Sequence, residues 1–134
     1  MRHILKSLTV ILGLATAGCQ AQNTSTGVVN MDVSVEDFAT KLSNSNEALI
    51  LDVRTDEEFM EGHLFGATQL DFFREDFREA VEKLDRAQPV YVYCRSGNRS
   101  GKAAKLMKEL GFAEVYNLEG GFGAWSRAGK AIAK

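Results

Sequence analysis

The sequence is poor in the residues that build disulfide frameworks, metal clusters and dithiol redox centres. Its 134 residues include two cysteines, two histidines and one proline. No C-x-x-C pair is present, which argues against a thioredoxin-like dithiol oxidoreductase. Because three histidine or cysteine ligands are not available in one cluster, we expect no metal site, and no cofactor is predicted. The small formal net charge of −2 gives no indication of a nucleic-acid partner.

The N-terminal apolar run is too short to be a membrane span. It covers residues 8–17, whereas a span needs about 20 apolar residues. Three residues that precede the run are basic or titratable: Arg2, His3 and Lys6. This layout is typical of a secretory signal peptide, which we predict over residues 1–18. The chain is therefore expected to leave the cytoplasm.

The end of this segment resembles the lipobox of bacterial lipoproteins, although Thr16 stands where leucine is usual. The resemblance implies that Cys19 is lipidated and becomes the first mature residue. The protein would then be anchored in the bacterial cell envelope and face the periplasm. The alternative is a plain signal peptide cleaved after Ala17, which would give a soluble secreted or periplasmic protein. Residues 19–30 are polar and lack an apolar period, so they are predicted to form a tether.

The remaining residues, 31–134, alternate between patterns typical of helices and patterns typical of buried strands. Apolar runs at 48–53, 67–70, 90–93 and 114–118 predict strands. Apolar residues at helical spacing predict helices that begin near Ser34, Thr55, Phe73, Ser100 and Gly121. Such alternation predicts one α/β domain, a three-layer sandwich with a mostly parallel central sheet and helices on both faces.

Cys94 is the most informative residue of this domain. It follows the apolar run 90–93 and precedes a short loop that leads into a helix. The thiol is therefore expected at the carboxyl end of a parallel strand and at a helix N-terminus, where N–H groups favour negative charge. Arg95 and Arg99 add two cations. These surroundings lower the pKa of a cysteine and predict a nucleophilic thiolate.

Three segments of the domain resemble signatures of the rhodanese family. They are LDVRTDEEF followed by EGHLFGA within residues 51–67, the loop CRSGNRS at 94–100, and LEGGFGAW at 118–125. The resemblance covers residues 31–134. It implies a rhodanese-like sandwich and transfer of a sulfane sulfur through a persulfide on Cys94. The predicted substrate-binding loop consists of Arg95, Ser96, Gly97, Asn98, Arg99 and Ser100.

The expected reaction is that of a thiosulfate:acceptor sulfurtransferase. The Cys94 thiolate attacks the outer sulfur of a small anionic donor such as thiosulfate, and a thiol or cyanide then accepts that sulfur. The N–H groups of the loop are expected to cradle the anionic sulfur.

Two other functions remain open from the sequence. The first is a persulfide carrier that a sulfur-relay protein loads. The second is a phosphatase or arsenate reductase, which is disfavoured by the length of the loop. Only four residues separate Cys94 from Arg99, one fewer than in the tyrosine-phosphatase loop. The shorter loop predicts a pocket for one sulfur atom rather than for a tetrahedral oxyanion.

The charged residues near the first signature are predicted to have structural roles. Arg54 and Glu58 are expected to form a buried ion pair, and His63 is expected to pack in a turn. Because an ionised cysteine needs no separate base, His63 is not required as one. For Asp52, a supporting electrostatic role beside the pocket remains the alternative to a structural one.

Overall fold

The computed structural model describes residues 27–134. The predicted signal peptide (1–18), Cys19 and the tether up to residue 26 lie outside the described residues. The strands are β1 (Val29–Val33), β2 (Leu49–Asp52), β3 (Thr68–Gln69), β4 (Val90–Tyr93) and β5 (Glu114–Leu118). The helices are α1 (Val35–Ser43), α2 (Asp56–Glu61), α3 (Phe77–Glu82), α4 (Asn98–Glu109) and α5 (Gly121–Arg127). Within residues 27–134, no helix combines the length and the apolar character needed to cross a membrane.

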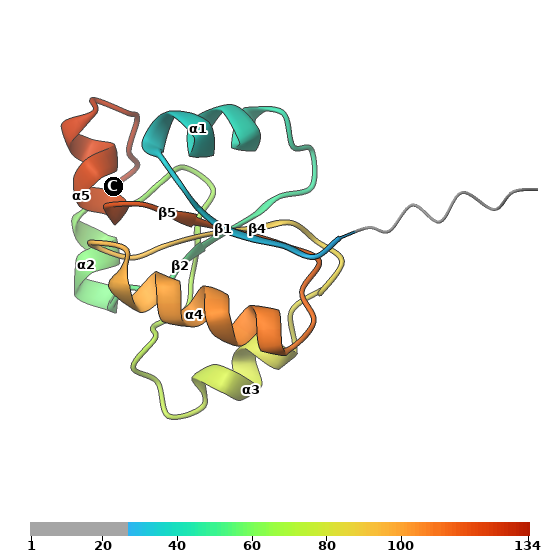
Figure 1. The fold of residues 1–134 in the computed structure, drawn as a ribbon. Helices are drawn as coiled ribbons and strands as arrows, with labels where there is room; N and C mark the ends of the chain where they lie inside the picture. Colours follow the sequence, from blue (N-terminus) through green and yellow to red (C-terminus); the bar gives the residue numbers. More distant parts are fainter. Residues whose placement is uncertain (1–26) are drawn as a thin grey trace, which may run out of the picture.

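The five strands form one parallel sheet in the order β1-β5-β4-β2-β3. Figure 1 shows α1 on one face and α3 and α4 on the other, with α2 and α5 near the carboxyl ends of the strands. The central strand β4 is buried on both faces, as its continuous apolar sequence predicts. This arrangement confirms the predicted α/β sandwich.

Each face of the sheet packs against its own layer of apolar side chains. On one face, Phe38 of α1 and Trp125 of α5 pack with the tyrosines of β4 and β5. On the other face, Val81 of α3 and Met107 of α4 pack with the valines of the strands. These two layers fix the helices against the sheet and hold the carboxyl ends of β2, β4 and β5 at one edge.

The helix boundaries follow the capping signals of the sequence. The Ser34 side chain accepts a hydrogen bond from the Asp37 backbone N–H at the start of α1. At the start of α2, Thr55 and Glu58 form the reciprocal capping box. The end of α4 carries Gly111 at a φ of +85°, as expected for the glycine that follows a helix.

Two elements differ from the sequence prediction. Strand β1 begins at Val29, so its first two residues lie in the segment predicted as tether. Polar residues alternate with apolar ones in this segment, so it lacks the continuous apolar run of a buried strand. It forms an edge strand by pairing with β5. Helix α3 begins only at Phe77, and Phe73, predicted for its apolar stripe, is 67% exposed in the preceding loop. The apolar spacing there arises partly from a surface aromatic residue and not from a continuous buried face.

Candidate active site

Cys94 lies where β4 ends, as the sequence predicts, and its residue surface is 1% exposed. The loop that follows folds back under the sulfur. Gly97 adopts a φ of +99°, a conformation that favours glycine, and its N–H donates to Cys94 Sγ at 3.1 Å. One turn further, the buried Ser100 hydroxyl donates to the same sulfur at 3.3 Å. The sulfur is thus held by groups that donate to a negative charge.

The pKa of the Cys94 thiol is lowered from its ordinary value even though the group is buried. Burial is the largest influence and raises the pKa, because it disfavours the thiolate. Hydrogen bonds from the Ser100 hydroxyl and from the backbone at Ser100, Ser96 and Gly97 outweigh it. The expectation that loop N–H groups favour the anion is therefore supported by the geometry.

The two loop arginines have different surroundings. Arg99 forms a bidentate ion pair with Glu58, with Nη1–Oε2 and Nη2–Oε1 distances of 2.8 Å. It also lies over the Phe73 ring, 5.5 Å from the centroid. Arg95 is exposed and has no hydrogen-bonded or ion-paired side-chain partner within residues 27–134. The charge of Arg99 is thus balanced by a carboxylate, and Arg95 is left as the unpaired cation of the loop.

The side chains of Ser96 and Asn98 are exposed and make no side-chain hydrogen bond within the described part of the chain. The cap of α4 is Gly97 and has no side-chain hydrogen bond. Of the predicted loop residues, the structure brings Gly97 and Ser100 directly to the sulfur and Ser96 to it through its backbone.

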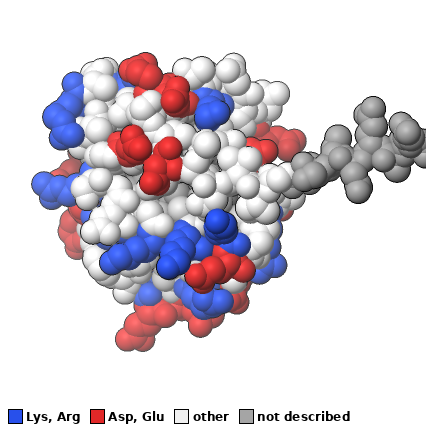
Figure 2. Space-filling view, in the orientation of Figure 1, with Lys and Arg blue, Asp and Glu red and all other residues white. Residues whose placement is uncertain are grey.

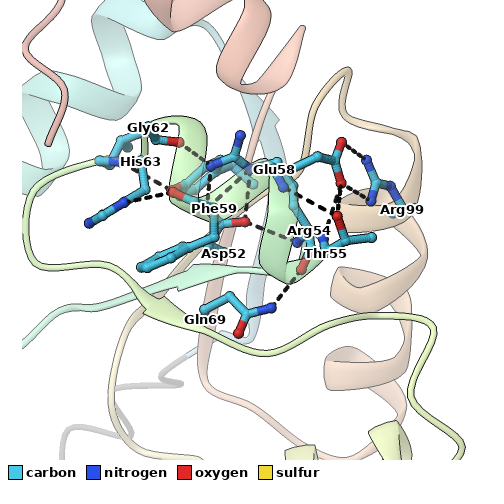
Figure 3. A network of polar contacts seen from close by, with 11 residues as sticks. Asp52, Arg54, Thr55, Glu58, Phe59, Gly62, His63, Gln69 and Arg99 are labelled. Carbon is cyan, nitrogen blue, oxygen red and sulfur yellow. Dashed lines mark hydrogen bonds and ion pairs between the residues drawn. The ribbon is translucent and has the colours of Figure 1, made fainter. Parts of the chain in front are cut away.

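The predicted ion pair between Arg54 and Glu58 is wrong. Arg54 pairs with Asp52 at 2.7 Å and donates to the Gly62 carbonyl oxygen at 2.7 Å (Figure 3). The Arg54 guanidinium also covers the Phe122 ring at 4.2 Å. Because Arg54 follows Asp52 by two residues along an extended segment, both side chains lie on the same side, whereas Glu58 points toward α4.

A buried polar group also connects this network to β4. The Tyr93 hydroxyl, next to Cys94 in the chain, donates to Asp52 Oδ2 and accepts from the Leu64 N–H. His63 stacks on Phe59 at a centroid distance of 3.8 Å, and its Nδ1 is 3.0 Å from the Phe59 carbonyl oxygen. This placement is consistent with the predicted packing role of His63.

Sequence reasoning missed three residues that shape the loop. Glu58 is the partner of Arg99. Asn117 of β5 lies with its Nδ2 3.4 Å from the Gly97 carbonyl oxygen and donates to Asp32 at 2.9 Å. Gly121 packs directly against the backbone of Cys94 and Arg95. The adjacent pair of glycines at 120–121 was a visible signal, whereas the partners of Glu58 and Asn117 depend on contacts distant in sequence.

A cavity of about 270 Å³ adjoins the loop on the side of Arg95. A larger hollow of about 670 Å³ lies at the opposite, amino end of the strands, where Pro89 and Glu114 line it. Of these two cavities, the smaller one lies nearer the thiol, because Arg95, the residue that follows Cys94, lines it. Within residues 27–134, no group of three histidine, cysteine or acidic side chains is arranged to hold a metal ion.

The fold and the loop define a class of α/β domains that present one cysteine thiolate at the carboxyl end of a parallel strand. The Rhodanese-like domain model matches residues 34–128, so the chain belongs to the rhodanese-like family. The fold is shared with solved structures of that family. A rhodanese-related protein from Thermoplasma volcanium has a TM-score of 0.67 and 25% identity, over 76% of this chain and 96% of that one.

The curated relatives carry names consistent with this family. A protein named Sulfurtransferase from Allochromatium vinosum is 32% identical over 75% of this chain and 92% of its own length. A thiosulfate sulfurtransferase from Coxiella burnetii is 38% identical over 65% of this chain and 79% of its own length. An uncharacterized protein from Bacillus subtilis is 40% identical over 66% of this chain and 67% of its own length.

Ser100→Ala tests the hydroxyl that donates to the Cys94 sulfur. Removal of the hydroxyl removes a donor to the Cys94 sulfur, so the pKa of the thiol rises toward its ordinary value. At a fixed pH below that pKa, less thiolate is present and the rate of sulfur uptake falls about 3- to 30-fold. The rate recovers as pH rises. The pH profile of iodoacetamide alkylation of Cys94 measures the shift, and an unshifted profile would contradict this role of Ser100.

The ion pair between Glu58 and Arg99 should make the stability of the fold depend on pH. The hydrogen bonds from Arg99 are the largest cause that lowers the pKa of Glu58, from an ordinary value of 4.5 to about 2. A lowered folded-state pKa gives stability that is complete above the unfolded pKa and is lost as pH falls through the folded one. We therefore expect Glu58→Gln to lower the free energy of unfolding by about 1–2 kcal/mol near pH 7. The loss is no larger because the ion pair is partly exposed and solvent screens it.

The difference between Glu58→Gln and the wild type should shrink between about pH 4.5 and pH 2, as the wild-type carboxylate is protonated. Urea unfolding at several pH values measures it. The matched control is Glu57→Gln, an exposed carboxylate on the same helix that has no ion pair within residues 27–134. A difference that stays constant with pH would contradict the role of this ion pair.

Proposed function

We propose that this protein is a sulfurtransferase that moves one sulfane sulfur from a small anionic donor to a thiol or cyanide through a persulfide on Cys94. The observation that carries the proposal is the sulfur at the end of β4 with two converging donors, Gly97 N–H and Ser100 Oγ. The names of the curated relatives also support it. Thiosulfate is the donor that we propose to test first.

The reaction proceeds in two balanced displacements. The Cys94 thiolate forms a bond to the outer sulfur of thiosulfate, and sulfite leaves with the electron pair of the broken S–S bond. The resulting Cys94–S–S⁻ remains among the donors of the loop, which stabilise its negative charge. Cyanide or a thiolate then attacks the terminal sulfur, and the electron pair of the Cys94–S bond returns to the thiolate. No external oxidant or reductant is required.

The charges around the loop support a small anionic donor. Arg95 is exposed and unpaired within the described residues, so its cation is available at the loop. Arg99 is held by Glu58 and contributes less net positive charge. A monoanionic or dianionic molecule of few atoms fits this single free cation better than a polyanion does.

The test is a thiosulfate:cyanide assay combined with mass spectrometry of the protein after donor treatment without reductant. Turnover together with a mass increase of one sulfur atom supports the enzyme. The absence of both turnover and a mass increase would overturn the proposal. It would reopen a phosphatase or arsenate-reductase function, for which phosphate esters and arsenate would then be assayed.

A persulfide carrier loaded by another protein is the second candidate. Lys102, Lys105 and Lys108 form an exposed row on α4, the helix that begins at the active-site loop. Figure 2 shows basic side chains gathered over this helix. The row fits an acidic sulfur-relay protein as partner. A mass increase with thiosulfate but without catalytic turnover would favour the carrier.

We also propose export to the bacterial cell envelope with a lipid on Cys19, or release as a soluble protein if cleavage follows Ala17. Both sites lie outside the described residues, so the proposal rests on the N-terminal sequence pattern alone. The intact mass of the mature protein distinguishes these two products.

A further inference from the structure

The cavity of about 270 Å³ beside the active-site loop is lined by charged residues of both signs. Binding of a small anionic sulfur donor does not require the negative ones. The cavity is lined by Arg54, Glu58, Glu61, Arg95, Phe122, Gly123 and Ser126. We propose that it binds the sulfur acceptor, and that the acceptor is a small zwitterionic thiol with both an ammonium and a carboxylate group. This inference rests on the proposed sulfurtransferase function.

Four of the lining residues are charged, and two of these charges are already neutralised. Arg54 is paired with Asp52 at 2.7 Å, and Glu58 is paired with Arg99 at 2.8 Å. Within residues 27–134, Arg95 and Glu61 have no hydrogen-bonded side-chain partner. The cavity therefore presents one unpaired cation from the loop and one unpaired carboxylate from α2.

This pair of opposite charges selects the class of ligand. Glu61 attracts an ammonium group and Arg95 attracts a carboxylate, so a molecule that carries both is favoured over a molecule that carries one. The apolar part of such a ligand meets the Phe122 ring, whose position is stabilised by the Arg54 guanidinium at 4.2 Å. Ser126 adds an exposed hydroxyl at the rim.

The size and position of the cavity agree with an acceptor of amino-acid size. Its volume lies just below the ~300–1,000 Å³ typical of sites for drug-sized ligands. Arg95 immediately follows Cys94, and Glu58 contacts Arg99 later in the same loop. Of the loop residues, Arg95 lines the cavity directly, and Arg99 is connected to its wall through Glu58. Figure 3 shows two of the lining residues, Arg54 and Glu58, together with Arg99, which pairs with Glu58.

The chemical step is a thiol–persulfide exchange. The acceptor thiolate forms an S–S bond to the terminal sulfur of the Cys94 persulfide, and the bond between that sulfur and Cys94 breaks. The electron pair of the broken bond returns to Cys94, which becomes the thiolate again. The product is the persulfide of the acceptor, and the atoms and charges balance without a further reactant.

The test compares four acceptors with thiosulfate as donor: L-cysteine, cysteamine, 3-mercaptopropionate and cyanide. Cysteamine lacks the carboxylate, and 3-mercaptopropionate lacks the ammonium. Cyanide has neither group, so it cannot make either charge contact in the cavity. We expect the lowest KM among the thiols for L-cysteine. In Glu61→Gln, the KM for L-cysteine and cysteamine should rise about three- to fivefold relative to that for cyanide, as expected for one exposed charge pair.

Two further variants make the result specific to the cavity. Glu57→Gln removes an exposed carboxylate of α2 that does not line the cavity, and its KM values should match those of the wild type. Ser126→Leu narrows the rim and should raise the KM for all three thiols relative to cyanide. Ser126 is exposed, so this substitution leaves the core intact.

The outcomes separate this inference from the proposed function. Normal turnover with cyanide together with equal KM values for the three thiols, unchanged in Glu61→Gln, would overturn the acceptor site and leave the sulfurtransferase standing. An absence of turnover with every acceptor, with no persulfide on Cys94, would overturn the proposed function itself.

Discussion

Cys94→Ser is expected to reduce thiosulfate:cyanide turnover by at least about a thousandfold and to abolish the mass increase after donor treatment. The serine hydroxyl is close in size to the thiol but remains protonated at neutral pH, so the donors of the loop have no anion to stabilise. Sulfur-transfer rates and intact mass after treatment with thiosulfate measure the two effects.

The other cysteine of the chain provides the matched control. Cys19→Ser should retain the turnover of the wild type, since the proposed chemistry uses Cys94 alone. Thermal unfolding should show that Cys94→Ser keeps its fold, because the substitution changes one atom at the edge of the core. Persistent sulfur uptake by folded Cys94→Ser would contradict the assignment of Cys94 as the nucleophile.

Gly121→Ala is expected to have the second largest effect, because it affects both stability and the shape of the active-site loop. Gly121 has a φ of +57°, and an added Cβ would lie 2.5 Å from the Cys94 carbonyl oxygen and 2.6 Å from the Arg95 carbonyl carbon. Left-handed strain and overpacking together cost about 2–5 kcal/mol. The expected decrease in Tm is about 10–20 °C, measured by thermal unfolding.

The clash also displaces the loop that follows Cys94. The backbone N–H groups of Phe122 and Gly123 donate to the carbonyl oxygens of Cys94 and Arg95 at 2.8 and 3.1 Å. A shift that relieves the clash lengthens these bonds and moves the donors around the sulfur. Turnover below the melting temperature should therefore fall as well, by about 10- to 100-fold.

Gly66→Ala is the control for the backbone strain alone. Gly66 also has a positive φ, +77°, but an added Cβ there would meet no atom within 4 Å. Its cost should be limited to about 1–2 kcal/mol, with turnover unchanged. Equal losses of stability in the two variants would contradict the close approach of α5 to the active-site loop.

Strands β2 to β5 and the place of Cys94 were predictable because their signals are local. Val90–Tyr93 is a continuous apolar run bounded by Pro89, and a strand of that composition is buried wherever it lies in a parallel sheet. The caps at Ser34 and Thr55 act within three residues. Cys94 then follows from the chain direction, since parallel strands present their carboxyl ends at one edge.

The ionic partners could not be predicted in the same way. Glu58 and Arg99 are 41 residues apart, and their contact depends on the packing of α2 beside the start of α4. Sequence spacing favoured Arg54 as the partner of Glu58, but the extended backbone turns Arg54 toward Asp52 instead. For the same reason, the hydrogen bond from Asn117 to Gly97 could not be predicted, because it depends on the packing of β5 beside the loop.

The sequence by itself determined the class of fold, the place of Cys94 at the end of a strand and the short loop that surrounds it. These features depend on the order of apolar runs and on neighbouring residues, which the chain specifies directly. Only the tertiary structure decided which charges are neutralised, which remain available in the cavity, and how closely Gly121 approaches Cys94. Such contacts join residues from different elements, and their distances follow from the packing of helices against the sheet and not from spacing along the chain.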